Sequence, residues 1–381
     1  MLRTGVSLAG AATVVVLALG CAARPGSEVL QPISRVPSYT NKVNLLVATT
    51  RERGSTEDPE AFTAARAKKL NFAALTVSIP THHVPGEIEW PDQIPPDPTR
   101  HFVTTDRQVL DGRGFLDKVR KRGRGGGTEA KSVLVFVHGY NTLYVEAVYW
   151  FAQIVHDSGF DGTAVLFAWP SRGKAPLYLA DREASTYSRD YLEDALVEIA
   201  KIPEVKEINI LAHSMGTWLA VETLRQAKMN GHGDFGGKLG DVVLASPDLD
   251  VNVFRTQLDV IGPLPRPMTI LVSGDDEALS LSTALAGGVD RAGSVTAADA
   301  RVVAAAQRYN LRVFDLTAVD DGEGNHHSKY SKSGPVIAAI GKGLRKDASA
   351  KSQSGVVSAI TDVGNSLLKV PSAVLETSAS Q

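Results

Sequence analysis

The stretch INILAHSMGTWLA, residues 208–220, decides the fold of this 381-residue chain. Its first half is an apolar run typical of a buried strand, and a helix-like run follows it. Ser214 stands at the junction, with Ala212 and Gly216 two positions to either side. A strand that turns sharply into a helix requires small residues at both of these positions and presents the serine as a nucleophile. A serine at such a junction can also simply cap the helix, so the motif alone leaves both interpretations open.

Predicted strands and helices alternate along the rest of the chain. This alternation predicts an α/β fold, a mostly parallel sheet of roughly eight strands with helices on both faces. The first two strands are close in sequence, and we expect them to pair antiparallel at one edge. The predicted strands cover 43–50, 72–79, 132–137, 163–169, 207–212, 241–246, 268–273 and 311–316, and the clearest helices 144–159, about 182–201 and 217–229.

Histidines that follow the late strands are candidates for the general base. Ligands of parallel sheets bind at the carboxyl ends of the strands, and in α/β hydrolases the acid and then the histidine follow the serine in the chain. Of the nine histidines, only His326 and His327 follow the strand predicted at 268–273. Both fall in a polar loop after the last predicted strand, where a triad histidine belongs, and one of them is expected to be a bystander.

Four aspartates after strands 241–246 and 268–273 are candidates for the acid that orients the histidine. They are Asp248, Asp250, Asp275 and Asp276. Each pair also fits a simpler role, because aspartate is a favoured cap of the following helix. The residues alone do not decide between the pairs.

Backbone N–H groups near Ser214 are candidates for an oxyanion hole. One is that of Met215, at the start of the helix, where the helix dipole favours negative charge. The second is expected from Gly139 or Tyr140, in the sequence HGYN after strand 132–137. His138 is interpreted as structural. Serine, acid, histidine and oxyanion donors therefore fall at strand ends in the required order, which favours catalysis over capping.

The N-terminus has the pattern of an exported lipoprotein. Residues 1–20 read as a signal peptide with a short apolar run, and LALGC, ending at Cys21, resembles the bacterial lipobox. Cys21 is the only cysteine, so no internal disulfide is possible. We expect a lipidated Cys21, a tether over 21–42, a catalytic domain over 43–345, and a tail over 346–381 that is an amphipathic helix or disordered. The expected location is the bacterial cell envelope, with the chain anchored to the membrane by lipid.

The net charge and the motifs of the chain limit the classes of ligand that we expect it to bind. The net charge of −2 gives no sign of nucleic-acid binding. The chain has neither metal-ligand spacing such as HExxH nor a glycine-rich dinucleotide loop, so we expect no metal and no organic cofactor. The expected partners are a small-molecule ester or acyl substrate and the membrane.

In combination, the motifs resemble those of a bacterial α/β-hydrolase family of uncharacterised function that is often described as esterase- or lipase-like. The matching segments run from about residue 43 to residue 345 and include VLVFVHGYN (133–141), LFAWPSRG (166–173), LAHSMGTWL (211–219), VSGDDEALSLS (272–282) and HHSKYS (326–331). The resemblance implies the α/β-hydrolase fold. It also implies Asp276 rather than Asp275 as the acid and His327 rather than His326 as the base, although Lys329 is an extra residue relative to the usual spacing.

The sequence therefore predicts a serine hydrolase with Ser214, His327 and Asp276 as its triad and an ester as its substrate. The alternatives are a thioesterase, amidase or transacylase on the same triad, or an idle, surface-anchored binding protein. Any lid over the site is expected within 96–131 or 284–305.

Overall fold

The computed structural model describes residues 24–54, 62–125, 127, 131–285, 288–297, 299–322 and 325–345. The predicted signal peptide, Cys21 and the tail over 346–381 lie outside these residues. Within them, no helix combines the length and apolar character needed to cross a bilayer.

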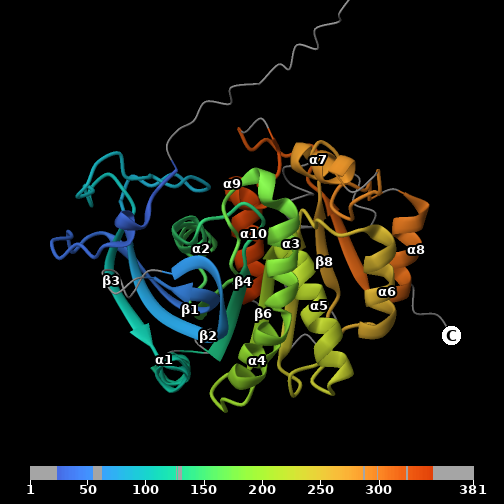
Figure 1. Cartoon of the computed structure of the whole chain (residues 1–381), viewed down its shortest axis with the longest axis horizontal. Coiled ribbons are helices and arrows are strands. Elements are labelled where there is room, and N and C mark those ends of the chain that lie inside the picture. The colour runs from blue at the N-terminus through green and yellow to red at the C-terminus, as the bar shows by residue number, and fades with distance from the viewer. Residues whose placement is uncertain are drawn as a thin grey trace, which may run out of the picture.

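A nine-stranded sheet forms the centre of the molecule, in the order β3-β2-β1-β5-β4-β6-β7-β8-β9 (Figure 1). Strands β1, β5, β4, β6, β7, β8 and β9 run parallel, while β2 pairs antiparallel with both β1 and β3. The bounds are β1 (Asn41–Arg53), β2 (Phe62–Ile79), β3 (Val103–Leu110), β4 (Ser132–Val137), β5 (Thr163–Ala168), β6 (Glu207–His213), β7 (Leu239–Ala245), β8 (Met268–Val272) and β9 (Leu311–Asp315).

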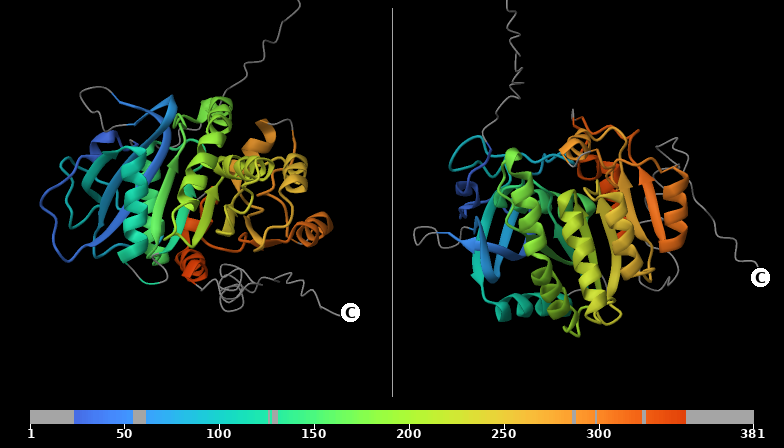
Figure 2. Two further views of the ribbon diagram at one scale, coloured as in Figure 1. Left: turned by 90° about the horizontal axis from the view of Figure 1, so that it is seen from below. Right: turned by 45° about the vertical axis from the view of Figure 1, so that its right-hand side comes forward.

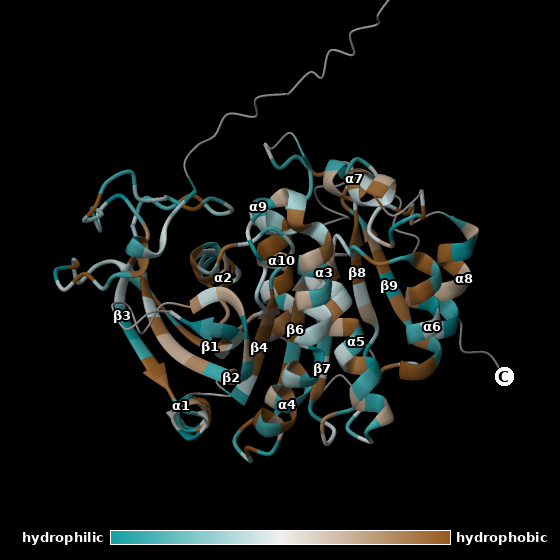
Figure 3. Ribbon diagram, viewed as in Figure 1, coloured by the Kyte–Doolittle hydropathy of each residue, from teal (hydrophilic) through white to brown (hydrophobic). Residues whose placement is uncertain are grey.

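Helices cover both faces of this sheet, because its central strands carry apolar side chains on both sides. In β4, Val133, Val135 and Val137 belong to one apolar core, and Leu134 and Phe136 belong to the other. Burial of each such side chain stabilises the fold by about 1.5–3 kcal/mol. Hydrophobic colour is accordingly prominent on central strands such as β4 and β8 (Figure 3).

The two helical layers lie on opposite sides of the sheet (Figure 2). Side chains of α1 (Gly112–Gly125), α3 (Tyr178–Tyr187), α4 (Arg189–Ala200), α5 (Met215–Met229), α6 (Val251–Ile261) and α8 (Ala300–Tyr309) belong to or pack on the first core. Those of η1 (Ser27–Leu30), α2 (Tyr144–Ser158), α9 (Lys329–Lys332) and α10 (Gly334–Arg345) belong to the second. The short helices η3 (Ala175–Leu177) and α7 (Glu277–Leu285) follow the carboxyl ends of β5 and β8.

The predicted α/β fold is confirmed, and two details differ. The antiparallel pair β1–β2 exists, but the sheet edge is β3, which the sequence analysis did not identify. The helix expected over about 182–201 is two helices, α3 and α4, that meet at Ser188. The Ser188 hydroxyl donates to the carbonyl of Ala184 at 2.8 Å, a local bond that competes with regular helix geometry.

Two expectations about irregular segments are wrong. The described part of the expected tether, 24–42, packs against the body, since Val29 and Leu30 of η1 are buried in the second core. Nor do residues 103–110 and 112–125, within the range considered for a lid, cover the site: β3 pairs with β2, and α1 buries Phe115 and Val119 at that end of the sheet. In the range 284–305, α8 packs against β9 and α6.

Candidate active site

Ser214 lies at a sharp turn between β6 and α5. Its backbone has φ 52° and ψ −127°, in a region that costs a non-glycine residue about 1–3 kcal/mol. The turn is held by hydrogen bonds from Ser214 N–H to the carbonyl of Ala245 (2.9 Å) and from Thr217 N–H to the carbonyl of Ser214 (2.9 Å). Strain maintained in this way at a single serine is typical of a nucleophile that is presented to substrate.

Small residues around the turn allow two backbone segments to approach each other. A Cβ on Gly216 would lie 2.4 Å from the carbonyl oxygen of His138, just after β4. A Cβ on Gly139 would lie 3.0 Å from the Cβ of Ser214. These contacts bring the HGYN turn against the serine, as an oxyanion hole built from both segments requires.

The capping interpretation of Ser214 is wrong. Its side chain makes no capping hydrogen bond to the first turn of α5, all of whose residues are described. Ser214 instead lines a cavity of about 610 Å³ at the carboxyl ends of the strands.

His327 lies in the same cavity and is oriented by Asp276. Its Nδ1 lies 2.8 Å and 3.0 Å from the two carboxylate oxygens of Asp276. The carboxylate is fully buried and also accepts a hydrogen bond from Leu279 N–H at 2.9 Å. Because Nδ1 is engaged by the acid, Nε2 is the ring nitrogen left to accept a proton.

The neighbouring aspartate and histidine face other partners. Asp275 accepts from the buried ammonium of Lys329 at 2.8 and 2.9 Å, and His326 pairs with Asp321 at 2.9 Å. Burial alone would raise the pKa of Asp275, but the hydrogen bonds from Lys329 hold it below its ordinary value. Lys329 also donates to the carbonyls of Leu316 and Thr317. The extra lysine of the HHSKY sequence therefore fixes the histidine loop to the ends of β8 and β9.

The aspartates after β7 do not meet His327. Asp248 is buried and accepts from Tyr178 (2.8 Å) and Ser282 (2.6 Å), with Arg291 at 3.3 Å. Asp250 caps α6 by accepting from the backbone N–H groups of Asn252 and Val253. Of the four candidate acids, the structure brings only Asp276 to His327.

The HGYN turn is tied to the WPSRG turn by one buried carboxylate. Asp181 accepts from the N–H of Asn141 (3.3 Å), the hydroxyl of Ser171 (2.6 Å) and the N–H of Arg172 (2.7 Å). Asn141 itself has φ 56°. Asp181 thus positions the segment from which the second oxyanion donor is expected, a role that could not be assigned to it from the sequence.

His213, directly before Ser214, supports the histidine loop. Its Nε2 donates to the carbonyl of His327 at 3.2 Å, and Ser246 donates to the same carbonyl at 3.1 Å. Burial, and then the nearby charge of His327, lower the pKa of His213 well below its ordinary value. His213 is therefore neutral, and its ring positions His327 by a hydrogen bond to the backbone carbonyl of His327.

His138 is structural, in agreement with its interpretation from sequence. Its ring is fully buried and stacks on Trp169 with centroids 5.0 Å apart. Burial lowers the pKa of His138 to about 3, so the ring is neutral. Four other aromatic residues, Trp90, Tyr140, Trp150 and Tyr178, line the cavity.

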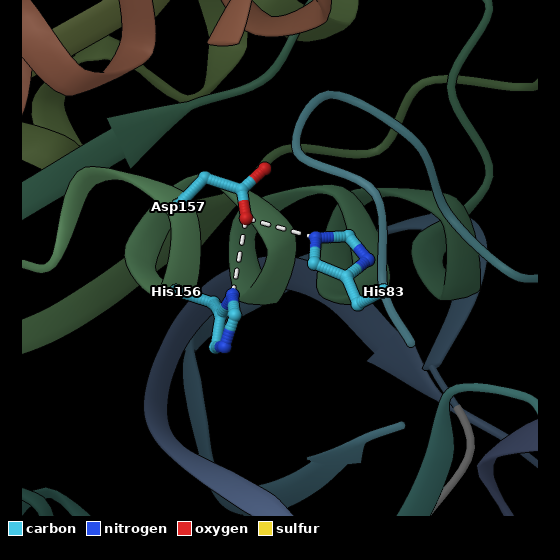
Figure 4. Close-up of side chains that lie close together, drawn as sticks. All are labelled: His83, His156 and Asp157. Atoms are coloured by element: carbon cyan, nitrogen blue, oxygen red, sulfur yellow. Dashed lines mark hydrogen bonds and ion pairs between the residues drawn. The ribbon is translucent and has the colours of Figure 1, made fainter. Parts of the chain in front are cut away.

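A second cluster, His83, His156 and Asp157, is the one group of metal-ligand type among the described residues (Figure 4). Asp157 Oδ1 lies 2.8 Å from His83 Nε2 and 3.0 Å from His156 Nδ1. The remaining ring nitrogens pair with Glu89 and Asn41, and Asp157 Oδ2 accepts from Gly86 and Gln153. Each ligand atom thus has a hydrogen-bond partner within the protein, and an ion would have to displace protons to bind. The cluster is a hydrogen-bonded clamp between the 80–102 loop and α2.

This clamp predicts a pH-dependent stability. Burial alone would lower the pKa of His83, but hydrogen bonds to Asp157 and Glu89 raise it from 6.5 to about 9. That rise corresponds to about 3 kcal/mol of stability. Since the folded-state pKa is the higher one, this contribution is fully present below pH 6.5 and is lost as the pH rises through about 9.

We therefore expect His83→Gln to lower the free energy of unfolding by up to about 3 kcal/mol near pH 6, and by much less near pH 10. Urea unfolding at both pH values measures the difference. His82→Gln, at the exposed neighbouring position, is the control and should have little effect at either pH. An equal loss for His83→Gln at both pH values would contradict a charged clamp.

A strained serine after a parallel strand and a carboxylate–histidine pair from later strands define the class: the chain is an α/β hydrolase. It belongs to the family described as "Alpha/beta hydrolase of unknown function (DUF900)", whose model matches residues 126–343, more than half of the chain. Among curated proteins, none matches the sequence.

The solved structures with similarity to the chain include two proteins related to lipases. Aspergillus fumigatus lipase B is 14% identical over 58% of this chain and 54% of that one, with a TM-score of 0.37. A lipase-esterase related protein from Clostridium acetobutylicum ATCC 824 is 15% identical over 63% of this chain and 95% of that one, with a TM-score of 0.26. The chain thus spans about half the length of the Aspergillus enzyme. TM-scores this low carry no argument about substrate.

Proposed function

We propose that the protein is a serine hydrolase that cleaves carboxylic esters through an acyl-enzyme. The observation that carries this proposal is the placement of Ser214 and the Asp276-oriented His327 around one cavity at the carboxyl ends of the strands. A capping serine or a bystander histidine would need neither the strained turn nor the buried carboxylate.

In the proposed reaction, Ser214 Oγ attacks the ester carbonyl while His327 Nε2 takes its proton. His327 then returns the proton to the leaving alcohol, and water repeats the sequence to release the acid. Asp276 holds the tautomer with the proton on Nδ1 and stabilises the imidazolium that forms. The developing oxyanion accepts from the backbone N–H of Met215 and from that of Gly139 or Tyr140.

An ester is the proposed substrate because an alcohol is a better leaving group than an amine and needs only the proton that His327 returns to it. The cavity wall combines the apolar and aromatic side chains of Tyr140, Trp150, Tyr178, Leu279 and Leu281 with polar side chains. The apolar part of this wall suits an acyl or alcohol group of the substrate.

A fluorophosphonate probe tests the proposal on the full chain. The expected result is covalent labelling at Ser214, located by mass spectrometry of the tryptic peptides. Labelling should be lost in Ser214→Ala, slowed strongly in His327→Ala, and retained in His326→Ala, since His326 pairs with Asp321 instead. A folded wild-type chain that neither labels nor hydrolyses nitrophenyl acetate would contradict the proposal.

We also propose that Cys21 is lipidated and holds the enzyme at the bacterial cell envelope. The support is the lipobox-like LALGC sequence and the single cysteine. Metabolic labelling with a palmitate analogue, compared between wild type and Cys21→Ser, measures the modification. Equal label in both would contradict it.

A further inference from the structure

The N-terminal end of the described chain forms part of the catalytic cavity. Pro25 lines the cavity, and Arg24 is fixed at its edge. The Arg24 guanidinium donates to the carboxylate of Glu146 (2.7 Å), to the carbonyl of Asn141 (2.7 Å) and to the carbonyl of Gly173 (2.6 Å). The chain therefore enters the body beside the HGYN turn and not at a remote surface.

This entry point limits how far the cavity can be from an anchor at Cys21. Cys21 precedes Arg24 by three residues, and a fully extended chain covers about 3.3–3.6 Å per residue. A lipid on Cys21 would thus hold the bilayer surface within roughly 10 Å of the cavity edge.

Large apolar side chains are exposed beside the same cavity. Leu281 and Leu285, one turn apart on α7, line the cavity and are 63% and 62% exposed. Leu179, directly after the cavity residue Tyr178, is 76% exposed. Exposure of leucine to water is unfavourable by about 1.5–3 kcal/mol per side chain relative to burial. Such a group of leucines at a site entrance marks an interaction surface.

Two basic residues precede Leu179 in the chain by a few positions. Arg172 and Lys174 are exposed on the loop that leads to Leu179. The loop is held in place, because Tyr140 donates to the carbonyl of Ala175 and Arg24 donates to that of Gly173. Exposed cations a few positions from an exposed leucine match the chemistry of a bilayer surface with anionic headgroups, where each basic residue contributes about 1 kcal/mol.

We propose that this rim, made of Leu179, Leu281, Leu285, Arg172 and Lys174, docks on an anionic lipid bilayer, and that the substrate is an ester presented by a lipid in it. The proposal rests on the ester hydrolysis proposed above. The leucines enter the acyl boundary of the bilayer, the two cations meet lipid phosphates, and the cavity opens onto the membrane that carries its substrate.

The first experiment measures docking without reference to catalysis. A polarity-sensitive dye is attached to Leu179→Cys and, as control, to Met229→Cys, both in the full chain. Met229 is 58% exposed at the C-terminal end of α5, the helix whose N-terminal end adjoins Ser214. The wild-type chain, labelled in parallel, gives any signal from Cys21.

Vesicles of phosphatidylcholine and phosphatidylglycerol in equal amounts should shift the dye emission at position 179 to the blue and leave position 229 unchanged. The shift should weaken with pure phosphatidylcholine, and in the additional double variant Arg172→Gln/Lys174→Gln. Equal shifts at both positions, no larger than the shift of the labelled wild-type chain, would mean that only the N-terminus meets the vesicle. A shift that depends on protein concentration and not on vesicles would identify a second copy as the partner. Either result overturns the proposal.

The second experiment links docking to turnover. Leu179→Ser should lower the rate on a long-chain nitrophenyl ester embedded in the same vesicles by at least about tenfold, the lower end of the effect of burying one leucine. Its rate on water-soluble nitrophenyl acetate should remain that of wild type, and Met229→Ser should match wild type on both substrates. Unchanged turnover of the embedded ester in Leu179→Ser would overturn the docking role. Failure of wild type on nitrophenyl acetate would instead count against the ester hydrolysis itself.

Discussion

Replacement of Ser214 by alanine is expected to lower kcat on nitrophenyl acetate by at least about 10⁴-fold, with the fold retained. The hydroxyl is the proposed nucleophile, and removal of any triad member leaves only the contribution of the oxyanion hole and of binding. Steady-state kinetics measures the loss, and near-ultraviolet circular dichroism reports the fold. A residual rate within tenfold of wild type would show that another group attacks the substrate.

The strained backbone gives this substitution a matched control. Ser214→Gly removes the same hydroxyl, but glycine adopts φ 52° without the cost that alanine bears. Both variants should be equally inactive, and the glycine variant should be more stable than the alanine variant by about 1 kcal/mol or more in urea unfolding. Equal stabilities would mean that the turn is relaxed in solution.

The second large effect is expected when two adjacent aspartates are replaced by asparagine: one replacement should lower kcat, and the other should lower stability. Asp276→Asn should lower kcat by about 10⁴-fold with little loss of stability, because an amide can hold His327 in the wrong tautomer. Asp275→Asn should retain most activity. Its carboxylate partners the buried ammonium of Lys329 and is about one-third exposed, so we expect a stability loss of about 1–2 kcal/mol after allowance for solvent screening.

Kinetics and urea unfolding of both variants separate these roles. A large loss of kcat in Asp275→Asn, with Asp276→Asn active, would assign the acid to Asp275. If both variants lost kcat only to the extent that they lost free energy of unfolding, the 273–277 loop would have a structural role and neither aspartate would be the catalytic acid.

The sequence was sufficient for the parallel part of the sheet because its strands are continuous apolar runs. Strands such as SVLVFV are buried on both faces and can be recognised without knowledge of their neighbours. The edge strand β3, VTTDRQVL, is only half buried. Because it contains charged residues, its sequence resembles that of the polar loops before it. The η1 segment was missed for a similar reason, since only Val29 and Leu30 of its four residues are buried.

At the site, the order of serine, aspartate and histidine along the chain predicted which segments meet. It did not predict which side chain of each segment points into the cavity. Adjacent residues such as Asp275 and Asp276 share their position in sequence, and only the course of the loop decides which one faces His327. The choice of Asp276 and His327 came from the family resemblance. The roles of Lys329, Asp181 and Arg24 depend on contacts between segments far apart in the chain, for which no local pattern exists.

The position of β1 in the sheet has a consequence for the matched family segment, 126–343. Residues 45–49 of β1 pair with residues 164–168 of β5, and all six residues of β5 are buried. A fragment limited to the matched segment would end its sheet at β5 and expose a flat, apolar edge strand, which is a template for aggregation. The N-terminal strands thus protect the hydrolase core from self-association, and the smallest soluble unit must include them.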